Sequence, residues 1–412
     1  MKNPIIIKEY DFLHCKEDKS ENYIKEKTFN AIKKFVLKNS ESAQYLKPCW
    51  KKGFGEVLQA QNYVGIIQTK DGTTIEILPK IADISDDENC NETKKILIKM
   101  LKTLKNSPFK NLDTANLKTN KMPLLEIFIT MFLEELSKLI RQGLRSDYIG
   151  REENLKYLKG KLDINEHIKR NYVHKERFFV KYQEFLSDRV ENRLIKTTLE
   201  FLYKMSHSTA NQQHIREFLF VFDDISLCGD VKTAFTNIKI NRQLAHYEQT
   251  LLWCKTFLLH DSFTPYSGDD VAFALLFDMN KLFESYVGHY LRQKPLSVKL
   301  QDKTHFLAYQ NSSGKFRLQP DIVITRENKP TIIADTKWKI LGENDYVNQA
   351  DMYQLYAYGT KYENCKRLYL IYPKSDVKSV TYSYREDLNL TTLFFDLRTS
   401  SFVDEETIDF LR

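Results

Sequence analysis

The sequence predicts an α+β protein of several domains, with a β-rich first part, a helical middle region and a last part in which helices cover a mixed sheet. The chain has 412 residues, enough for two or three domains. Its apolar fraction of 42%, with 13% aromatic residues, is sufficient for packed cores. The spacing of the apolar residues changes along the chain between that of strands and that of helices. We therefore expect domains at 1–95, 96–255 and 256–412.

The first part contains a hairpin signal. Two β-type runs, 63–70 and 73–78, are joined by Asp71-Gly72, and Asp-Gly between such runs strongly favours a tight turn. A helix is expected before the hairpin, at about 20–38. The acidic stretch 83–92 is expected to be a solvated loop.

The middle region is predicted to be mainly helical. Apolar residues recur at helical spacing in 124–142 and 188–205. Ser187 or Asp188 would cap the second helix, with Glu191 available for a capping box. Short strands are expected at 158–164 and 178–182.

Charged residues of the middle region allow two interpretations. Basic side chains cluster among aromatic ones, namely Lys156, Lys159, Lys161, Lys169, Arg170, Lys175, Arg177 and Lys181. They suit contacts to DNA phosphates, but a charge-rich stretch is also typical of a solvated face. Arg145 and Asp147 are expected to form an ion pair, and the run 189–193 is expected to be structural.

The last part carries the most informative pattern. Two β-branched runs, 318–324 and 331–337, flank the loop-like segment 326–330. A hairpin symmetric about Asn328 places residues whose numbers are equally far from 328 opposite each other. Directly opposed residues have Cβ atoms about 4.5–5.5 Å apart.

This register would bring two acids and a lysine together. Asp321 would oppose Asp335, and Lys337 would share the face of Asp335 because strand residues alternate. Such a trio suits a Mg²⁺ site, with Mn²⁺ as a substitute, since Mg²⁺ prefers carboxylate, water and phosphate oxygens. The metal would polarise a phosphate and acidify a water, while the lysine would orient or deprotonate that water or stabilise charge. The alternative is a surface hairpin with a weak, solvated ion pair.

Helices are predicted on both sides of the hairpin. The upstream helix would start with Asp278 or Asn280 as its N-cap, and Glu284 could point back toward the hairpin. Glu284 could equally be a solvated helix residue. Three further strands are expected at 367–372, 379–384 and 391–395.

The downstream helix is predicted at 349–361. It would place Gln354 and Tyr358 on one face. Its tyrosines are expected in the core and at its rim rather than as a platform for base stacking.

The order Pro-Asp, then Asp-x-Lys, is similar to the PD-(D/E)xK nuclease signature, and longer motifs resemble McrC. These motifs are 64–67, 77–81, 142–148, 158–163, 188–196, 278–283, 320–323 and 335–339. McrC is the endonuclease subunit of McrBC modification-dependent restriction systems, and the resemblance spans about residues 50 to 360.

The resemblance implies a function as well as a fold. The last domain would be an α/β/α restriction-endonuclease-like module whose catalytic residues are Asp321, Asp335 and Lys337, with Glu284 and Gln354 as further candidates. Asp321 and Asp335 would bind the metal. The partner would be a McrB-like hexameric AAA+ GTPase that the N-terminal part docks into and stimulates, and the substrate would be double-stranded DNA with modified cytosine.

Two other functions stay open. The chain could be a non-catalytic adaptor that plugs into and activates an AAA+ partner, or a nuclease that acts alone. The net charge of +7 agrees with a polyanionic partner without requiring one.

Composition argues against other classes of site and against a membrane location. The six cysteines contain no CxxC pair, so neither a disulfide framework nor a zinc site is indicated. The most apolar predicted helix, 124–139, contains three glutamates, and no signal peptide is evident. We expect a cytoplasmic protein.

Overall fold

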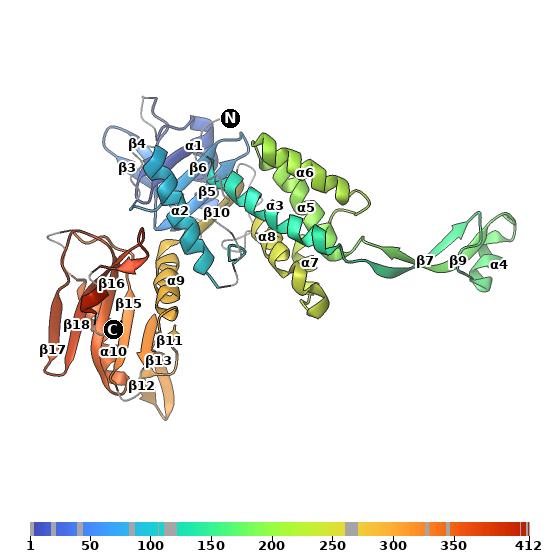
Figure 1. The fold of residues 1–412 in the computed structure, drawn as a ribbon. Helices are drawn as coiled ribbons and strands as arrows, with labels where there is room; N and C mark the ends of the chain where they lie inside the picture. Colours follow the sequence, from blue (N-terminus) through green and yellow to red (C-terminus); the bar gives the residue numbers. More distant parts are fainter. Residues whose placement is uncertain are drawn as a thin grey trace. The chain divides into compact units, whose positions relative to one another are not determined.

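The computed structural model is an α+β chain that divides into two compact units (Figure 1). One unit spans Met122–Ser267, and the other combines Pro4–Lys121 with Gly268–Arg412. The division into three domains stays a prediction. The residues that the structure describes are 4–17, 22–38, 44–81, 87–105, 107–110, 122–259, 271–325, 329–342, 347–403, 405–408 and 411.

A four-stranded sheet combines strands from both segments of the second unit. The predicted hairpin is confirmed as β5 (Tyr63–Thr69) and β6 (Thr74–Leu78). β1 (Ile5–Lys8) pairs with β6 in parallel, and β10 (Val271–Asp278) pairs with β5 antiparallel. A Cβ at Gly65 would lie 2.1 Å from a β10 carbonyl oxygen, so only glycine permits this close approach.

The rest of the N-terminal part surrounds this sheet. β2 (Phe12–Leu13), β4 (Gly55–Ala60) and β3 (Leu46–Lys51) form a three-stranded sheet in that order. α1 (Glu26–Lys38) begins later than predicted, because residues 22–25 are not helical.

The second helix corrects the prediction for the acidic stretch 83–92. α2 (Asp87–Thr103) begins inside it, so residues 87–92 are helical; residues 83–86 lie outside the described residues. The physical reason is packing, since Ile96, Leu97, Met100 and Leu101 of α2 are buried at helical spacing.

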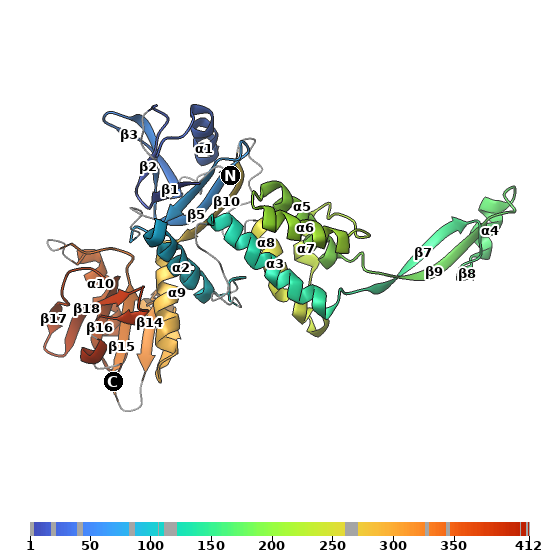
Figure 2. The ribbon, with the colours of Figure 1, turned by 45° about the horizontal axis from the view of Figure 1, so that its top comes forward.

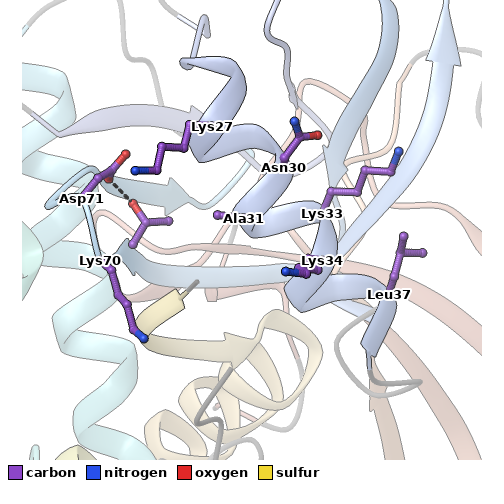
Figure 3. Close-up of a pocket in the computed structure, with 9 residues that line it drawn as sticks. Lys27, Asn30, Ala31, Lys33, Lys34, Leu37, Lys70 and Asp71 are labelled. Atoms are coloured by element: carbon purple, nitrogen blue, oxygen red, sulfur yellow. Dashed lines mark hydrogen bonds between the residues drawn. The ribbon is translucent and has the colours of Figure 1, made fainter. Parts of the chain in front are cut away.

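A hollow of about 720 Å³ lies between α1 and the turn of the β5–β6 hairpin (Figure 3). Four lysines line it: Lys27, Lys33, Lys34 and Lys70. The Asp71 carboxylate accepts hydrogen bonds from the hydroxyls of Thr28 and Thr69, both at 2.6 Å, which fixes the turn against the helix. None of the predicted site residues lines this hollow.

The Met122–Ser267 unit is a group of helices (Figure 2). Its main helices are α3 (Leu124–Gln142), α5 (Val190–Met205), α6 (Thr209–Val221), α7 (Val231–Asn237) and α8 (Glu248–Leu258). The first matches its predicted bounds. No helix in the described part of the chain is long and apolar enough to cross a membrane.

The predicted cap of α5 is wrong. Its N-cap is Arg189, without a side-chain cap bond. Asp188 instead binds the Arg193 guanidinium through both oxygens, at 2.8 and 2.7 Å, and accepts from the Ser226 backbone N–H. A bidentate charged pair outcompetes a cap, because its hydrogen bonds are the stronger ones.

The predicted ion pair between Arg145 and Asp147 is also wrong. Arg145 pairs with Glu191 at 3.0 Å, which withdraws Glu191 from a capping box, and Asp147 lies 3.6 Å from Arg189. A buried carboxylate needs a cationic partner more than an exposed one does. Arg145 therefore pairs with the buried Glu191 rather than with the exposed Asp147.

A long two-stranded ribbon extends from these helices (Figures 1 and 2). It consists of β7 (Asp147–Leu155) and β9 (Phe178–Leu186), with β8 (Lys161–Leu162) and α4 (Ile164–Asn171) toward its far end. β8 lies within the strand predicted at 158–164, and β9 begins where the strand predicted at 178–182 begins. β7 was not predicted.

Many of the basic side chains on this ribbon have acidic partners. Lys159 pairs with Glu184, Lys181 pairs with Asp163, and Arg170 pairs with Glu166. The charges of the ribbon are therefore partly balanced locally. This favours the solvated-face interpretation of the basic cluster.

The last part of the chain contains a mixed sheet in the order β11-β14-β15-β16-β18-β17, with β19 on β18. β15, β16 and β18 run parallel to one another, and the other neighbours are antiparallel. The strands are β11 (Ser297–Leu300), β14 (Ile322–Thr325), β15 (Thr331–Thr336), β16 (Cys365–Pro373), β17 (Thr381–Arg385), β18 (Leu388–Asp396) and β19 (Ser401–Phe402). The three strands predicted after the downstream helix correspond to β16, β17 and β18.

Helices cover both faces of this sheet. Leu355 of α10 (Gln349–Lys361) shares a buried cluster with Phe394. The next residue of β18, Phe395, instead contacts Tyr286 of α9 (Met279–Arg292), with ring centroids 5.9 Å apart. Since neighbouring strand residues point to opposite faces, α9 and α10 lie on opposite sides of the sheet.

The buried carboxylate of Glu126 ties α3 to the turn between α5 and α6. It accepts hydrogen bonds from the Ser206 hydroxyl at 2.8 Å, the Ser208 backbone N–H at 3.1 Å and the Asn211 amide at 2.8 Å. Three buried donors depend on one side chain.

We predict that Glu126→Ala lowers the local stability of this turn by about 3 kcal/mol or more, because buried donors lose their acceptor. Hydrogen-exchange mass spectrometry of peptides covering α5 and α6 measures this as roughly 100-fold faster exchange. Glu217→Ala, at an exposed position on α6, is the control and should leave exchange unchanged. Equal protection in both variants would refute the role of Glu126.

Candidate functional site

The hairpin of β14 and β15 has the predicted register. The paired residues are Ile322 with Ala334, Val323 with Ile333, and Ile324 with Ile332, all symmetric about position 328. The loop residues 326–328 lie outside the described residues. Extending the register by one position places Asp321 opposite Asp335, as expected from the sequence.

Asp321 is held by hydrogen bonds from two directions. One carboxylate oxygen accepts from the backbone N–H and the hydroxyl of Thr336, both at 2.8 Å. The other accepts from the Gln301 side-chain amide at 3.1 Å. The same amide also donates to Glu284 of α9, so Gln301 joins Glu284 to Asp321.

Lys337 joins Asp335 to α10. Its Nζ lies 2.7 Å from an Asp335 oxygen and 3.2 Å from an Asp351 oxygen. It donates to the Gln354 Oε1 at 3.3 Å, and the Gln354 amide in turn donates to the Tyr358 hydroxyl at 2.7 Å. Gln354 and Tyr358 therefore share a helix face, as predicted.

The five predicted site residues lie in two hydrogen-bonded groups, one with Asp321 and Glu284 and one with Asp335, Lys337 and Gln354. Tyr358 and Gln319 connect the second group to Gln301 of the first. Asp351 was not predicted, although its place three residues before Gln354 on the same helix was a usable signal. Gln301 follows β11 and gave no signal in the sequence. Of the tyrosines on α10, Tyr358 is buried, whereas Tyr353 is 65% exposed.

Burial and mutual repulsion dominate the electrostatics of the acids. Burial raises the pKa of Asp321 to about 6, and the nearby Glu284 adds to the shift. Burial likewise raises the pKa of Asp335 to about 6, with a further contribution from Asp321. Burial acts to lower the pKa of Lys337, but Asp335 and Asp351 raise it overall, so the ammonium stays charged.

These acids fit a hard divalent cation. Carboxylate oxygens are the donors that Mg²⁺ prefers, and a bound cation would offset the burial of Asp335 and its repulsion from Asp321. Within the described residues, no group of three or more His, Cys, Asp or Glu side chains is arranged to hold a metal. Asp321 and Asp335 would supply two ligands, and water and phosphate the rest, which is the usual Mg²⁺ pattern.

Residues beside the N-terminal sheet form hydrogen bonds with Trp338, which follows Lys337 in the chain. The Trp338 indole N–H donates to both carboxylate oxygens of Glu9, at 3.0 and 2.9 Å. The Lys80 backbone N–H donates to Glu9 at 2.9 Å, and the Lys80 ammonium donates to the Trp338 carbonyl at 2.7 Å. Glu9 and Trp338 are both buried. Residues that follow β1 and β6 thus fix the end of β15.

The start of α9 is fixed in a similar way. The Asp278 carboxylate accepts from the Asn280 backbone N–H at 2.9 Å, which confirms Asp278 as the N-cap. It also accepts from the Asn62 amide at 3.3 Å. The helix that carries Glu284 is therefore anchored beside β5.

Comparisons with known proteins agree with this architecture. A family model described as McrBC 5-methylcytosine restriction system component matches residues 58–373. A solved half-complex of Thermococcus gammatolerans McrB AAA+ hexamers with bound McrC has a chain that is 18% identical, with a TM-score of 0.70 over 98% of this chain and 97% of that one. A chain in the Thermococcus gammatolerans McrBC complex is 20% identical, with a TM-score of 0.51 over 71% and 88% of the two chains. No curated protein matches.

We predict a pH-dependent stability that originates at Glu9. Burial raises its pKa to about 7 from an ordinary 4.5. Between these two values the folded chain binds a proton that the unfolded chain does not, so stability falls as pH rises through about 7. Glu9 would contribute about 3 kcal/mol to this fall.

Glu9→Gln should therefore gain stability relative to the wild type as the pH rises from about 5 to about 8. Urea denaturation of both proteins at the two pH values, followed by Trp fluorescence, measures the difference. Asp321 and Asp335 are common to both proteins and cancel. A stability difference between the proteins that is the same at both pH values would contradict the prediction.

Proposed function

We propose that this chain, which belongs to the McrBC 5-methylcytosine restriction system component family, is the endonuclease subunit of such a system. It would hydrolyse phosphodiester bonds in double-stranded DNA that carries modified cytosine, with Mg²⁺ as its metal. The observation that carries the proposal is the partly buried cluster of Asp321, Asp335 and Lys337 where the adjacent strands β14 and β15 meet at one end. A mixed sheet with helices on opposite faces supports assigning the last part of the chain to the PD-(D/E)xK fold.

Each residue has a role that follows from its contacts. Asp321 and Asp335 would hold Mg²⁺, which when bound polarises the phosphate and acidifies a water. Lys337 keeps Asp335 oriented through their 2.7 Å contact and presents a positive charge where negative charge develops on the phosphate. Gln354 orients the Lys337 ammonium, and Glu284 acts on Asp321 through Gln301.

We further propose a McrB-like AAA+ GTPase hexamer as partner. The support is the family membership and the fold shared with a chain solved with McrB AAA+ hexamers. The resemblance implies that the N-terminal part docks into this partner and stimulates its GTP hydrolysis. The complex would act in the cytoplasm.

We predict that Asp335→Asn lowers the rate of cutting at least about 100-fold. Replacing a residue that only hydrogen-bonds to a metal ligand already lowers metal affinity or activity roughly 10- to 100-fold. Cytosine-methylated and unmethylated plasmids are incubated with the chain, the partner GTPase, GTP and Mg²⁺. GTP turnover is measured in parallel and should not change. Asp387→Asn, at an exposed carboxylate paired with Arg385, is the control and should cut like the wild type.

Two outcomes would contradict the proposal. Undiminished cutting by Asp335→Asn would remove the site assignment. Stimulated GTP turnover, with no cutting of either plasmid by the wild type, would favour the non-catalytic adaptor.

A further inference from the structure

A small hairpin precedes Asp321 and belongs to no larger sheet. β12 (Phe306–Gln310) and β13 (Ser313–Arg317) pair with each other and, in the described chain, with no other strand (Figure 1). Asn311 and Ser312 both have positive φ, 47° and 63°, which is the two-residue type I′ turn. The hairpin is thus a defined element rather than a loose loop.

Apolar side chains of the hairpin face solvent. Tyr309 is 66% exposed, Phe316 75% and Leu307 41%. Phe316 also has a φ of +55°, a strained conformation that is uncommon for a bulky residue. Exposed aromatic residues and local strain on one element indicate a contact surface.

The charge of the hairpin has one sign. In the hairpin itself, 306–317, the formally charged residues are Lys315 and Arg317; Lys303 lies three residues before β12 and next to Asp302. The whole chain, in contrast, has 62 basic and 55 acidic residues. Among the described residues, Lys303 and Lys315 form no ion pair. Lysine is depleted in protein–protein interfaces, whereas contacts to DNA phosphates require it.

The hairpin is joined directly to the candidate active site. The Leu318 backbone N–H donates to the His305 carbonyl at 2.9 Å, which closes the base of the hairpin. The next side chain, Gln319, donates to Gln301, the residue that binds both Asp321 and Glu284.

The distance along the chain is also short. Asp321 follows Arg317 by four residues, so the two are at most about 14 Å apart, or about four base-pair steps of DNA. A duplex cut at Asp321 and Asp335 would therefore lie within reach of the hairpin.

We infer that residues 303–317 form a DNA-engaging hairpin beside the scissile phosphate. Lys303 and Lys315 contact backbone phosphates, and Tyr309 and Phe316 lie against the base steps as an apolar wedge of the kind that minor-groove-binding proteins use. The inference rests on the proposed nuclease function, since it takes the bound polyanion to be the DNA substrate.

The test measures DNA binding separately from cutting. Fluorescence anisotropy of a labelled duplex, titrated with the full chain carrying Asp335→Asn in complex with its partner, gives affinity over a range of salt concentrations. The double variant Lys303→Ala/Lys315→Ala should reduce the slope of log affinity against log salt by about 2, one unit per lost phosphate contact.

Tyr309→Ala and Phe316→Ala should each weaken binding by roughly 5-fold or more with the salt slope unchanged, because a stacking contact and not a charge is removed. Tyr309→Phe should retain wild-type affinity. In the cutting-competent chain, the same alanine variants should raise KM more than they lower kcat. Phe220→Ala and Lys239→Ala, at exposed positions on the helical unit, are the matched controls and should bind like the wild type.

Three outcomes would overturn the inference. The first is wild-type affinity and salt slope in all hairpin variants. The second is an equal loss of affinity in the matched controls. The third is unchanged DNA affinity with reduced GTP turnover by the partner, which would make the hairpin a protein contact. Failure of the proposed function gives a different result from failure of this inference. In that case the wild type does not cut DNA, while anisotropy still measures whether the hairpin binds it.

Discussion

The register of the β14–β15 hairpin is the constraint on which the candidate site depends. The paired residues 322–324 and 332–334 are all buried, so apolar contacts on both faces fix the pairing. A slip by one residue would turn Asp335 and Lys337 to the other face of the sheet and away from Asp321. The acids are thus brought together by the packing of their apolar neighbours, in spite of their own repulsion.

The surroundings of these acids come from distant parts of the chain. α10 supplies Asp351 and Gln354 to Lys337, while α9 supplies Glu284 to Asp321 through Gln301. The contact between Glu9 and Trp338 joins positions that are 329 residues apart. A change in the N-terminal sheet therefore has a direct physical route to the residue after Lys337.

The sequence predicted what local patterns determine. Alternation and loop symmetry were sufficient for the register of Asp321 and Asp335, and helical spacing was sufficient for α3 and α10. The pairing of β5 with β10, the placement of Gln301 and the bond from Trp338 to Glu9 depend on contacts between residues far apart in sequence, for which spacing carries no information. The Arg145–Asp147 error has a different cause, because Arg145 pairs with the buried Glu191, which is 46 residues away in sequence, and not with its near neighbour Asp147.

The energetics of the acids bear on the choice between a nuclease and an adaptor. Burial raises the pKa of both Asp321 and Asp335, and the charge of Asp321 adds to the shift of Asp335. Bringing such charges together in a poorly solvated place destabilises a fold. A chain that used its last part only as a scaffold would be more stable with amides or apolar residues at these positions. Strongly perturbed acids beside a lysine are typical of sites where charge is used in chemistry. The arrangement therefore supports the nuclease proposal over the adaptor on physical grounds, independently of any likeness to other proteins.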